Sequence, residues 1–179
     1  MPALIRTIAY ALVFVGLLLI LLPAKVLSWS GVPAPATMGW PQICGIVIGV
    51  AGAVLALGCA GVFVRVGKGT PAPFDPPRRL VTRGPYRFVR NPMYIGAGLA
   101  VGGAALYYES LALLLFAICF LIAAHAFVLF YEEPALRRLF REDYDAYCRR
   151  VHRWLPEFRA ATTRRMRVVS IHPAIARKR

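Results

Sequence analysis

Residues 110–131 read SLALLLFAICFLIAAHAFVLFY and contain no Asp, Glu, Lys or Arg. A helix needs about 17 to 25 largely apolar residues to cross the hydrocarbon core of a membrane, so this stretch predicts a transmembrane helix. Three more uncharged runs precede it, at residues 8–23, 43–64 and 92–108. The hydrophobic content of 59% is also too high for an ordinary soluble domain. We therefore expect an all-α integral membrane protein with four transmembrane helices.

The first apolar run needs separate treatment, because Arg6 precedes it as in a secretory signal. The run exceeds the roughly 7 to 15 residues of a signal core, and no small-x-small cleavage site ends it. Pro23 and Lys25 instead indicate the end of a span at the far interface. We expect this helix to be retained.

The basic residues are distributed unevenly among the connections. Arg6 alone precedes the first run and Lys25 alone follows it, whereas seven basic residues separate the second and third runs and thirteen follow Tyr131. Lys and Arg near membrane helices stay on the cytoplasmic side. The second connection and both termini are therefore expected in the cytoplasm, with the protein in the plasma (inner) membrane and the 107–110 turn outside.

The net charge of +14 fits this orientation and suggests a partner. Each basic residue near a membrane surface adds about 1 kcal/mol of attraction to anionic lipid head groups. Nucleic-acid binding would also use a basic segment, but no base-stacking aromatic residues interleave the positive charges after residue 158. We expect anionic lipid and no nucleic acid as a partner.

The four cysteines predict neither disulfides nor a metal site. Cys44, Cys59 and Cys119 lie in apolar runs, and Cys148 is expected on the reducing side of the membrane. The spacing of Cys and His residues matches no metal-binding pattern. We expect no bound metal.

Small residues in two of the runs predict close helix packing. Gly45, Gly49 and Gly52 lie on one helical face of the second run, and Gly98 and Gly102 do so in the third. Membrane helices approach each other closely through such faces. We expect these glycines to have a structural role.

The segment before the third run cannot be a continuous helix, because residues 67–91 include eight glycines and prolines. An ordered Pro-rich loop is expected there. Asn91 followed by Pro92 is typical of an N-cap and a first helical position. The free amides of such a helix start suit an anionic group such as a carboxylate.

Beyond Tyr131, aromatic and leucine residues recur every three or four positions between arginines, which predicts a cytosolic amphipathic C-terminal helix. The chain is thus expected to comprise two N-terminal transmembrane helices at residues 1–66, a core at 67–158 with the third and fourth helices as a tight hairpin, and a poorly ordered basic tail at 159–179.

Several polar residues converge at the cytosolic end of this hairpin. His125 and Glu132 are seven residues apart, so a regular helix would place them on one face. The short outer turn brings Arg90, Asn91 and Tyr94 level with Glu132. A polar pocket under the Pro-rich loop is therefore expected.

Structural alternatives exist for each of these residues. A single His125 on an apolar helix can be an interhelical hydrogen-bonding residue. Glu132 and Glu133 can be interfacial anchors paired with Arg87 or Arg90. Taken singly, these residues do not decide between a structural and a functional role.

Two linked segments resemble a known family. RRLVTRGPYRFVRNPMYIG at residues 78–96 and HAFVLFYEEPALRRLFREDYDAYCRRVHRWLP at 125–156 closely resemble the isoprenylcysteine carboxyl methyltransferase and phospholipid methyltransferase family. The resemblance covers about residues 69–156 and leaves the first two spans outside. It implies a helical membrane enzyme that binds S-adenosyl-L-methionine on the cytosolic side and takes its methyl acceptor, a membrane lipid or lipophilic substrate, from the bilayer.

The resemblance also implies cofactor contacts, which fall on matching positions of both segments. These are Arg78, Arg79, Leu80, Val81, Tyr86, Asn91, Pro92, Met93, Tyr94 and Glu132. Arg90 joins them through its expected place in the pocket. Aromatic faces suit a sulfonium cation, and a glutamate suits the amine or hydroxyls of this cofactor.

The chain departs from the family pattern at three positions. Asn91 stands where many members have histidine and keeps a polar helix start. Val128 stands where the isoprenylcysteine enzymes have an arginine that would neutralise a substrate carboxylate, which argues against prenylcysteine as the acceptor. Arg141 follows Phe140 where glycine is common, and we expect this surface change to have no consequence.

Methyl transfer from a sulfonium is an in-line displacement, so the protein mainly aligns the reactants and excludes water. An amine or hydroxyl acceptor must lose a proton, which His125 or Glu133 could accept. Two other functions remain open: a membrane reductase with a nicotinamide cofactor, and a non-enzymatic scaffold or transporter. The absence of an internal repeat and of mid-membrane charges argues against transport.

Overall fold

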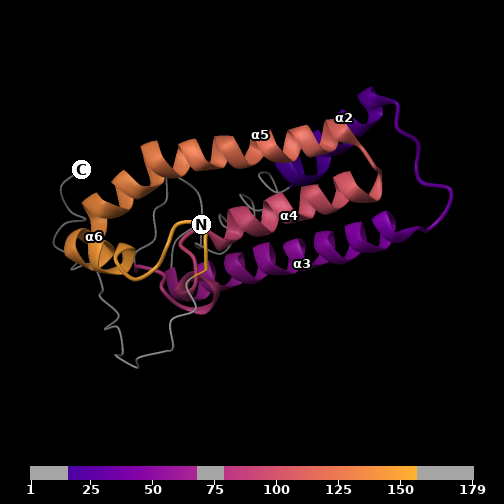
Figure 1. The fold of residues 1–179 in the computed structure, drawn as a ribbon. Helices are drawn as coiled ribbons and strands as arrows, with labels where there is room; N and C mark the ends of the chain where they lie inside the picture. The colour runs from indigo at the N-terminus through magenta and orange to yellow at the C-terminus, as the bar shows by residue number, and fades with distance from the viewer. Residues whose placement is uncertain (1–15, 68–78, 157–179) are drawn as a thin grey trace, which may run out of the picture.

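The computed structural model describes residues 16–67 and 79–156, and this part of the chain is helical, with connecting loops and no β-strand (Figure 1). The expectation of an all-helical protein is confirmed for these ranges. Arg78, most of the Pro-rich loop and the 159–179 tail lie outside the described residues, as does the start of the first apolar run.

The elements follow one another in the order η1 (Gly16–Leu21), α2 (Leu22–Ser30), α3 (Trp40–Val62), η2 (Phe63–Gly67), η3 (Gly84–Arg87), α4 (Pro92–Tyr107), α5 (Leu111–Phe127), η4 (Val128–Glu132) and α6 (Glu133–Cys148). The short elements η1, η2 and η4 are π-helical, and η3 is a 3-10 turn.

Two helices of the described part are long and apolar enough to cross a membrane, Trp40–Val62 and the continuous Leu111–Cys148. The hydrocarbon core requires only about 20 residues, so the apolar part before Glu132 is by itself long enough for the second candidate crossing. Gly16–Ser30 and Pro92–Tyr107 are shorter apolar helices. Large apolar side chains such as Val54, Leu57 and Ile122 are exposed, as expected for a membrane protein.

Helices α3 and α4 pack backbone against backbone. A Cβ atom added at Gly52 would lie 2.5 Å from the Ala100 amide nitrogen, and one at Gly45 would lie 2.7 Å from the Gly103 carbonyl oxygen. The predicted glycine face of the second run is therefore an interface. On α4 the contacting glycines are Gly96 and Gly103 instead of the expected pair.

The expected glycine pair of α4 has different surroundings. Gly98 faces the Leu121 side chain of α5, and a Cβ atom at Gly102 would meet nothing within 4 Å among the described residues. The close approach of α3 and α4 therefore uses the other glycines of this helix.

The turn between α4 and α5 brings the two helices antiparallel (Figure 1). Ser110 caps α5, since its hydroxyl accepts a hydrogen bond from the Leu113 amide at 3.3 Å. Buried Gln42 ties the start of α3 to this turn by donating to a Glu109 carboxylate oxygen at 2.8 Å and to the Tyr107 carbonyl oxygen at 3.3 Å.

Helix α6 continues from α5 through η4 and bends away from it (Figure 1). Phe140, Tyr144 and Tyr147 are buried on its inner side. Arg141 interrupts the helix with φ 43° and ψ −120°, a conformation that favours glycine. Arg141 is on the surface, but it stands where glycine is common in the family, and an arginine adopts this φ only with strain. The expectation that the change from glycine has no consequence does not take this backbone conformation into account.

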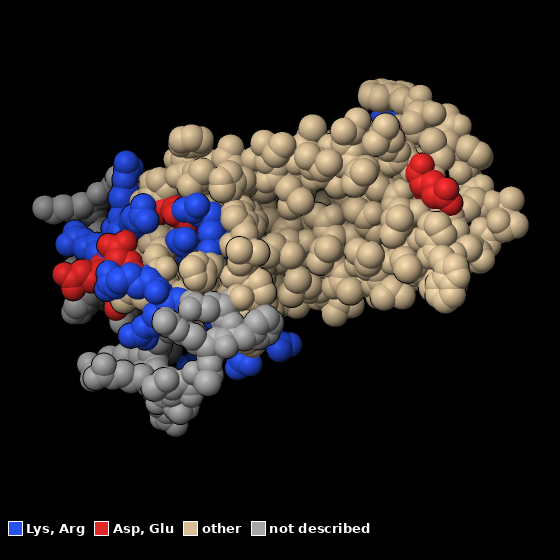
Figure 2. Space-filling model, viewed as in Figure 1, with Lys and Arg blue, Asp and Glu red and all other residues tan. Residues whose placement is uncertain are grey.

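Charged side chains gather at one end of the molecule, over α6 and its neighbouring loops, and the long body formed by α3, α4 and α5 carries almost none (Figure 2). Glu109, in the turn between α4 and α5, and Lys25, in α2, are charged residues outside this cluster. The polar end therefore has a pronounced excess of arginine.

Candidate functional site

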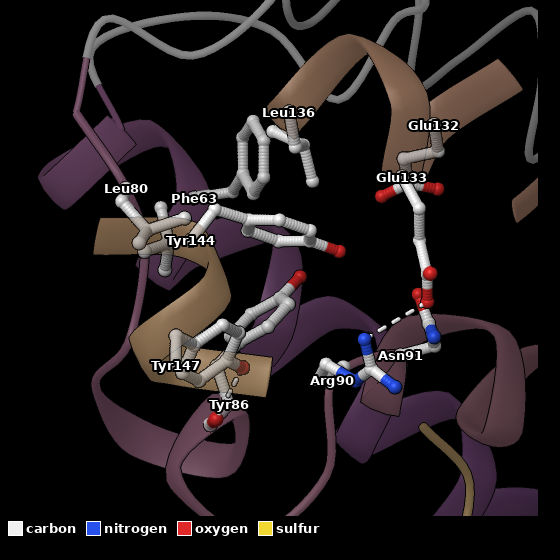
Figure 3. Close-up of a pocket in the computed structure, with 11 residues that line it drawn as sticks. Phe63, Leu80, Tyr86, Arg90, Asn91, Glu132, Glu133, Leu136, Tyr144 and Tyr147 are labelled. Carbon is white, nitrogen blue, oxygen red and sulfur yellow. Dashed lines mark hydrogen bonds and ion pairs between the residues drawn. The ribbon is translucent and has the colours of Figure 1, made fainter. Parts of the chain in front are cut away.

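A pocket opens at the charged end, between the end of α3 with η2, the loop before α4, and the junction of η4 with α6 (Figure 3). The space between its side chains amounts to about 420 Å³, including the open mouth. Its lining consists of Phe63, Leu80, Val81, Tyr86, Arg90, Asn91, Glu132, Glu133, Leu136, Tyr144 and Tyr147. The elements that the sequence predicted to converge do meet here.

Seven of the predicted site residues line this pocket, and they come from both family-like segments. They are Leu80, Val81, Tyr86, Arg90, Asn91, Glu132 and Glu133. Figure 3 shows the aromatic and leucine side chains on one side of the space and Arg90, Asn91 and the two glutamates on the other. The pocket is therefore two-sided, with an apolar wall and a polar wall.

Four lining residues were not among the predicted site residues: Phe63, Leu136, Tyr144 and Tyr147. The Tyr147 hydroxyl donates to the Tyr86 carbonyl oxygen at 2.6 Å, which fastens α6 to the loop before α4. Burial raises the pKa of both tyrosines, so they stay neutral. The three-residue spacing of Tyr144 and Tyr147 on one helical face was the signal that could have identified them.

Glu132 and Tyr94 meet across the α4 and η4 ends. The Tyr94 hydroxyl donates to the Glu132 Oε2 atom at 3.1 Å. Glu132 is half-buried and lines the pocket. This contact agrees with the expectation that the hairpin brings Tyr94 level with Glu132.

Glu133 is buried and surrounded by arginines. Arg153 donates two hydrogen bonds to it, from Nε to Oε1 at 2.7 Å and from Nη2 to Oε2 at 3.0 Å. Arg90 Nη1 lies 3.0 Å from Oε1, and Arg137 Nη2 lies 3.9 Å from Oε2. Burial alone would raise the pKa of Glu133, but these arginines hold it below its usual value. The interpretation of Glu133 as the partner of Arg90 therefore agrees with the geometry.

Arg90 has a buried nitrogen without a partner among the described residues. Besides the ion pair with Glu133, its Nη1 donates to the Cys148 Sγ atom at 2.8 Å. Its Nε is buried and has no hydrogen-bond partner among the residues that the structure describes. A buried unsatisfied donor at a pocket wall is a place for an acceptor atom of a ligand.

Asn91 occupies the predicted N-cap position before Pro92, but its side chain does not cap the helix. Its Nδ2 instead donates to the Arg153 carbonyl oxygen at 3.3 Å, and the Arg90 amide donates to the His152 carbonyl oxygen at 2.9 Å. The first amides of α4 are thus left without a cap from Asn91.

His125 is exposed on α5 and does not line the pocket. Its Nδ1 accepts a hydrogen bond from the Trp154 indole at 2.8 Å, so a hydrogen-bonding role is present. The π-helical η4 begins after His125 and ends at Glu132, and a π-helical turn has more residues than a regular α-helical turn. The seven-residue spacing therefore does not predict a shared face here, and of these two residues the pocket includes only Glu132.

The remaining predicted residues that the structure describes do not line the pocket, and neither does Tyr94. Pro92 is buried at the start of α4, and Met93 packs against the cluster of Cys59, Val81 and Tyr86. Arg79 is described but does not line the pocket. The described residues contain no group of His, Cys, Asp and Glu side chains that could hold a metal ion.

These features define a helical membrane protein with a two-sided pocket at its arginine-rich end. Residues 38–143 match the sequence model of a family described as phospholipid methyltransferase, and the match spans more than half of the chain. The chain belongs to this family of methyltransferases. The match includes α3, so the second apolar run lies inside the family region, contrary to the expectation from the two motifs. No curated protein sequence and no solved structure matches the chain.

Proposed function

We propose that this protein is an integral membrane methyltransferase that uses S-adenosyl-L-methionine and methylates a lipid or lipophilic acceptor at the cytosolic membrane face. Family membership supports the reaction class. The observation that carries the proposal is the pocket, of whose eleven lining residues nine lie in the matched region. In it, Glu132 and Arg90, whose buried Nε has no partner among the described residues, lie opposite an aromatic wall (Figure 3).

The residues of the pocket fit this cofactor. The orphan Nε of Arg90 suits a carboxylate, as do the uncapped amides at the start of α4. Glu132 can accept hydrogen bonds from an amine or from ribose hydroxyls. Phe63, Tyr86 and Tyr144 offer aromatic faces for a ring and for a sulfonium cation.

The bound cofactor would supply a methyl group activated on a sulfonium. The protein residues bind, orient and exclude water: the aromatic wall and Leu136 keep the pocket dry, and Arg90 fixes one end of the ligand. Glu133 is committed to Arg90 and Arg153, so we assign it an orienting role in place of proton transfer. If the methyl acceptor is an amine or a hydroxyl and reaches His125 along α5, His125 remains the residue predicted to take up its proton.

The acceptor side of the proposal rests on Val128. This residue is completely buried at the position where the isoprenylcysteine enzymes have an arginine. A buried valine at this position cannot neutralise a substrate carboxylate. A lipid acceptor without a carboxylate at the reacting group fits this substitution better than a prenylcysteine.

We further propose four membrane crossings with both termini in the cytoplasm. The 16 residues of α4 extend about 24 Å, slightly less than the roughly 30 Å hydrocarbon core. Because α3 and α5 flank α4, its ends can remain at membrane depth within protein. The arginine excess around α6 supports a cytosolic position for the pocket, next to anionic lipid head groups.

Calorimetry on the purified protein in detergent tests the cofactor. S-adenosylhomocysteine should bind, NADPH should not, and Arg90→Ala should weaken the binding. Incubation of membranes with a radiolabelled methyl donor then identifies the acceptor, with label expected in the lipid fraction. Binding of NADPH alone would favour the reductase, and binding of neither ligand would favour a non-enzymatic scaffold.

A further inference from the structure

After α6 the chain returns to the pocket through residues 149–156, the return segment. Val151 is buried against Phe140, Tyr144 and Tyr147 of α6. His152 forms an isolated parallel bridge with Val89 just before α4. The segment therefore lies against the loop that carries Arg90 and Asn91, although it follows the family match in sequence.

Arg153 links this segment to the charged centre of the pocket. Its guanidinium makes a two-point contact with Glu133, whose side chain is only 4% exposed, while Arg90 contacts the same Oε1 atom. A buried carboxylate needs such partners, because an unpaired charge in the interior is strongly unfavourable. The position of Glu133, and with it that of Arg90, therefore depends on Arg153.

The backbone of the return segment holds the same two pocket residues. The His152 carbonyl accepts from the Arg90 amide, and the Arg153 carbonyl accepts from the Asn91 side chain. Arg90 is thus fixed at its amide by the return segment and at its guanidinium by Glu133. The Arg90 side chain, which lines the pocket and whose buried Nε has no partner among the described residues, is therefore held at both ends.

We infer that Arg153 is a positioning residue for ligand binding, which acts through Glu133 to orient Arg90. This inference rests on the proposed function, because the ligand that Arg90 receives is taken to be the carboxylate-bearing cofactor. Arg153 does not itself line the pocket, so its effect on binding passes through the other two residues.

The side chain at this position needs the planar fork of arginine. A lysine would keep the charge but could not make both hydrogen bonds to Glu133 in one plane. Arg137 provides a matched control, because it also approaches Glu133 but only at 3.9 Å and with a side chain that is 53% exposed. Surface ion pairs of this kind contribute little.

The first experiment measures the dissociation constant of S-adenosylhomocysteine by calorimetry for wild type, Arg153→Ala, Arg153→Lys and Arg137→Ala. Loss of the two-point contact should weaken binding about tenfold or more in Arg153→Ala, with a smaller loss in Arg153→Lys. Arg137→Ala should stay within about twofold of wild type. Wild-type affinity in Arg153→Ala would overturn the inference.

A double-mutant cycle separates positioning from a general structural role. In the Arg90→Ala background, Arg153→Ala should cause no further loss of affinity, because the residue through which it acts is absent. Equal losses in both backgrounds would show that Arg153 does not act through Arg90. The Arg153→Lys variant allows the same cycle if Arg153→Ala does not fold.

A readout without cofactor uses Cys148, whose sulfur contacts Arg90. The rate at which a water-soluble maleimide alkylates Cys148 is measured in a Cys44→Ser, Cys119→Ser background. In Arg153→Ala this rate should shift to the value found in Arg90→Ala. In Arg137→Ala it should stay at the wild-type value. A wild-type rate in Arg153→Ala beside a changed rate in Arg90→Ala would overturn the inference. Failure of wild type to bind S-adenosylhomocysteine, with these rates as expected, would overturn only the proposed function.

Discussion

Two adjacent glycines of α4 provide a sharp test of the helix packing. A Cβ atom at Gly103 would contact the backbone of Gly49 directly and lie 2.6 Å from the Gly45 carbonyl oxygen, whereas one at Gly102 would meet nothing within 4 Å in the described part. Backbone atoms cannot rotate away as a side chain can. The substitution Gly103→Ala must therefore separate α3 from α4.

The magnitude follows from the contact distances. Restoring an ordinary 3.4 Å contact to the oxygen now at 2.6 Å requires a shift of about 0.8 Å. Overpacking of this kind costs about 1 to 3 kcal/mol, and the shift also loosens the neighbouring glycine contacts. Alanine at Gly102 should instead stabilise the helix by about 0.5 to 1 kcal/mol, through its higher helix propensity.

Thermal unfolding of the purified variants in detergent, followed by circular dichroism, measures the difference. For a chain of this length we expect Gly103→Ala to lower Tm by about 2 to 12 °C and Gly102→Ala to leave it unchanged or higher. The two variants differ by one position and carry the same added methyl group. Equal Tm values would show that α3 and α4 do not meet at Gly103.

Three further predictions follow from single contacts. Arg141→Gly should raise the free energy of unfolding by about 1 kcal/mol, because glycine relieves the strain of the positive φ. Arg138→Gly, in the regular part of α6, should lower it by up to about 1 kcal/mol. Chemical denaturation compares the two variants, and a loss of stability in both would contradict backbone strain at Arg141. Arginines lower the pKa of Glu133, so its ionised form contributes stability that is complete above the usual pKa of 4.5 and is lost as pH falls through the lowered pKa. In Glu133→Gln, the curve of unfolding free energy against pH should therefore be flatter below about pH 4.5. A curve identical to that of wild type would refute this role. Tyr94→Phe should weaken S-adenosylhomocysteine binding about 2- to 10-fold, because it removes the hydrogen bond to Glu132. Tyr108→Phe, at the opposite turn, should leave the affinity unchanged. Calorimetry measures both variants, and equal affinities would exclude Tyr94 from the site.

Much of the fold could be predicted because its causes are local in sequence. Uncharged runs identify apolar helices by length, and Pro92 begins α4 where its missing amide is harmless. The short Tyr108 to Ser110 connection requires α4 and α5 to be antiparallel, which brings Tyr94 to Glu132. The family-like segment at residues 78–96 therefore predicted most of the pocket-lining residues that precede α4.

Long-range choices were harder to predict. Gly98 and Gly102 form one small-residue face of α4, and Gly96 and Gly103, seven residues apart, form another. The spacing rule accepts both pairs, and only the position of α3 decides between them. Arg153 is similar, since nothing near it in sequence indicates that the chain returns to Glu133.

The acidic pair shows how a backbone irregularity decides the site. With regular α-helical phase, His125 and Glu132 would share a face. The π-helical η4 changes that phase, so that Glu133 is buried against Arg90 while His125 stays on the outer surface with Trp154. Such π-helical insertions are frequent at functional sites and have no clear sequence signature. A sequence pattern can therefore identify the residues of this junction, but the rotation that selects which of them face the pocket depends on the packing of η4 between α5 and α6.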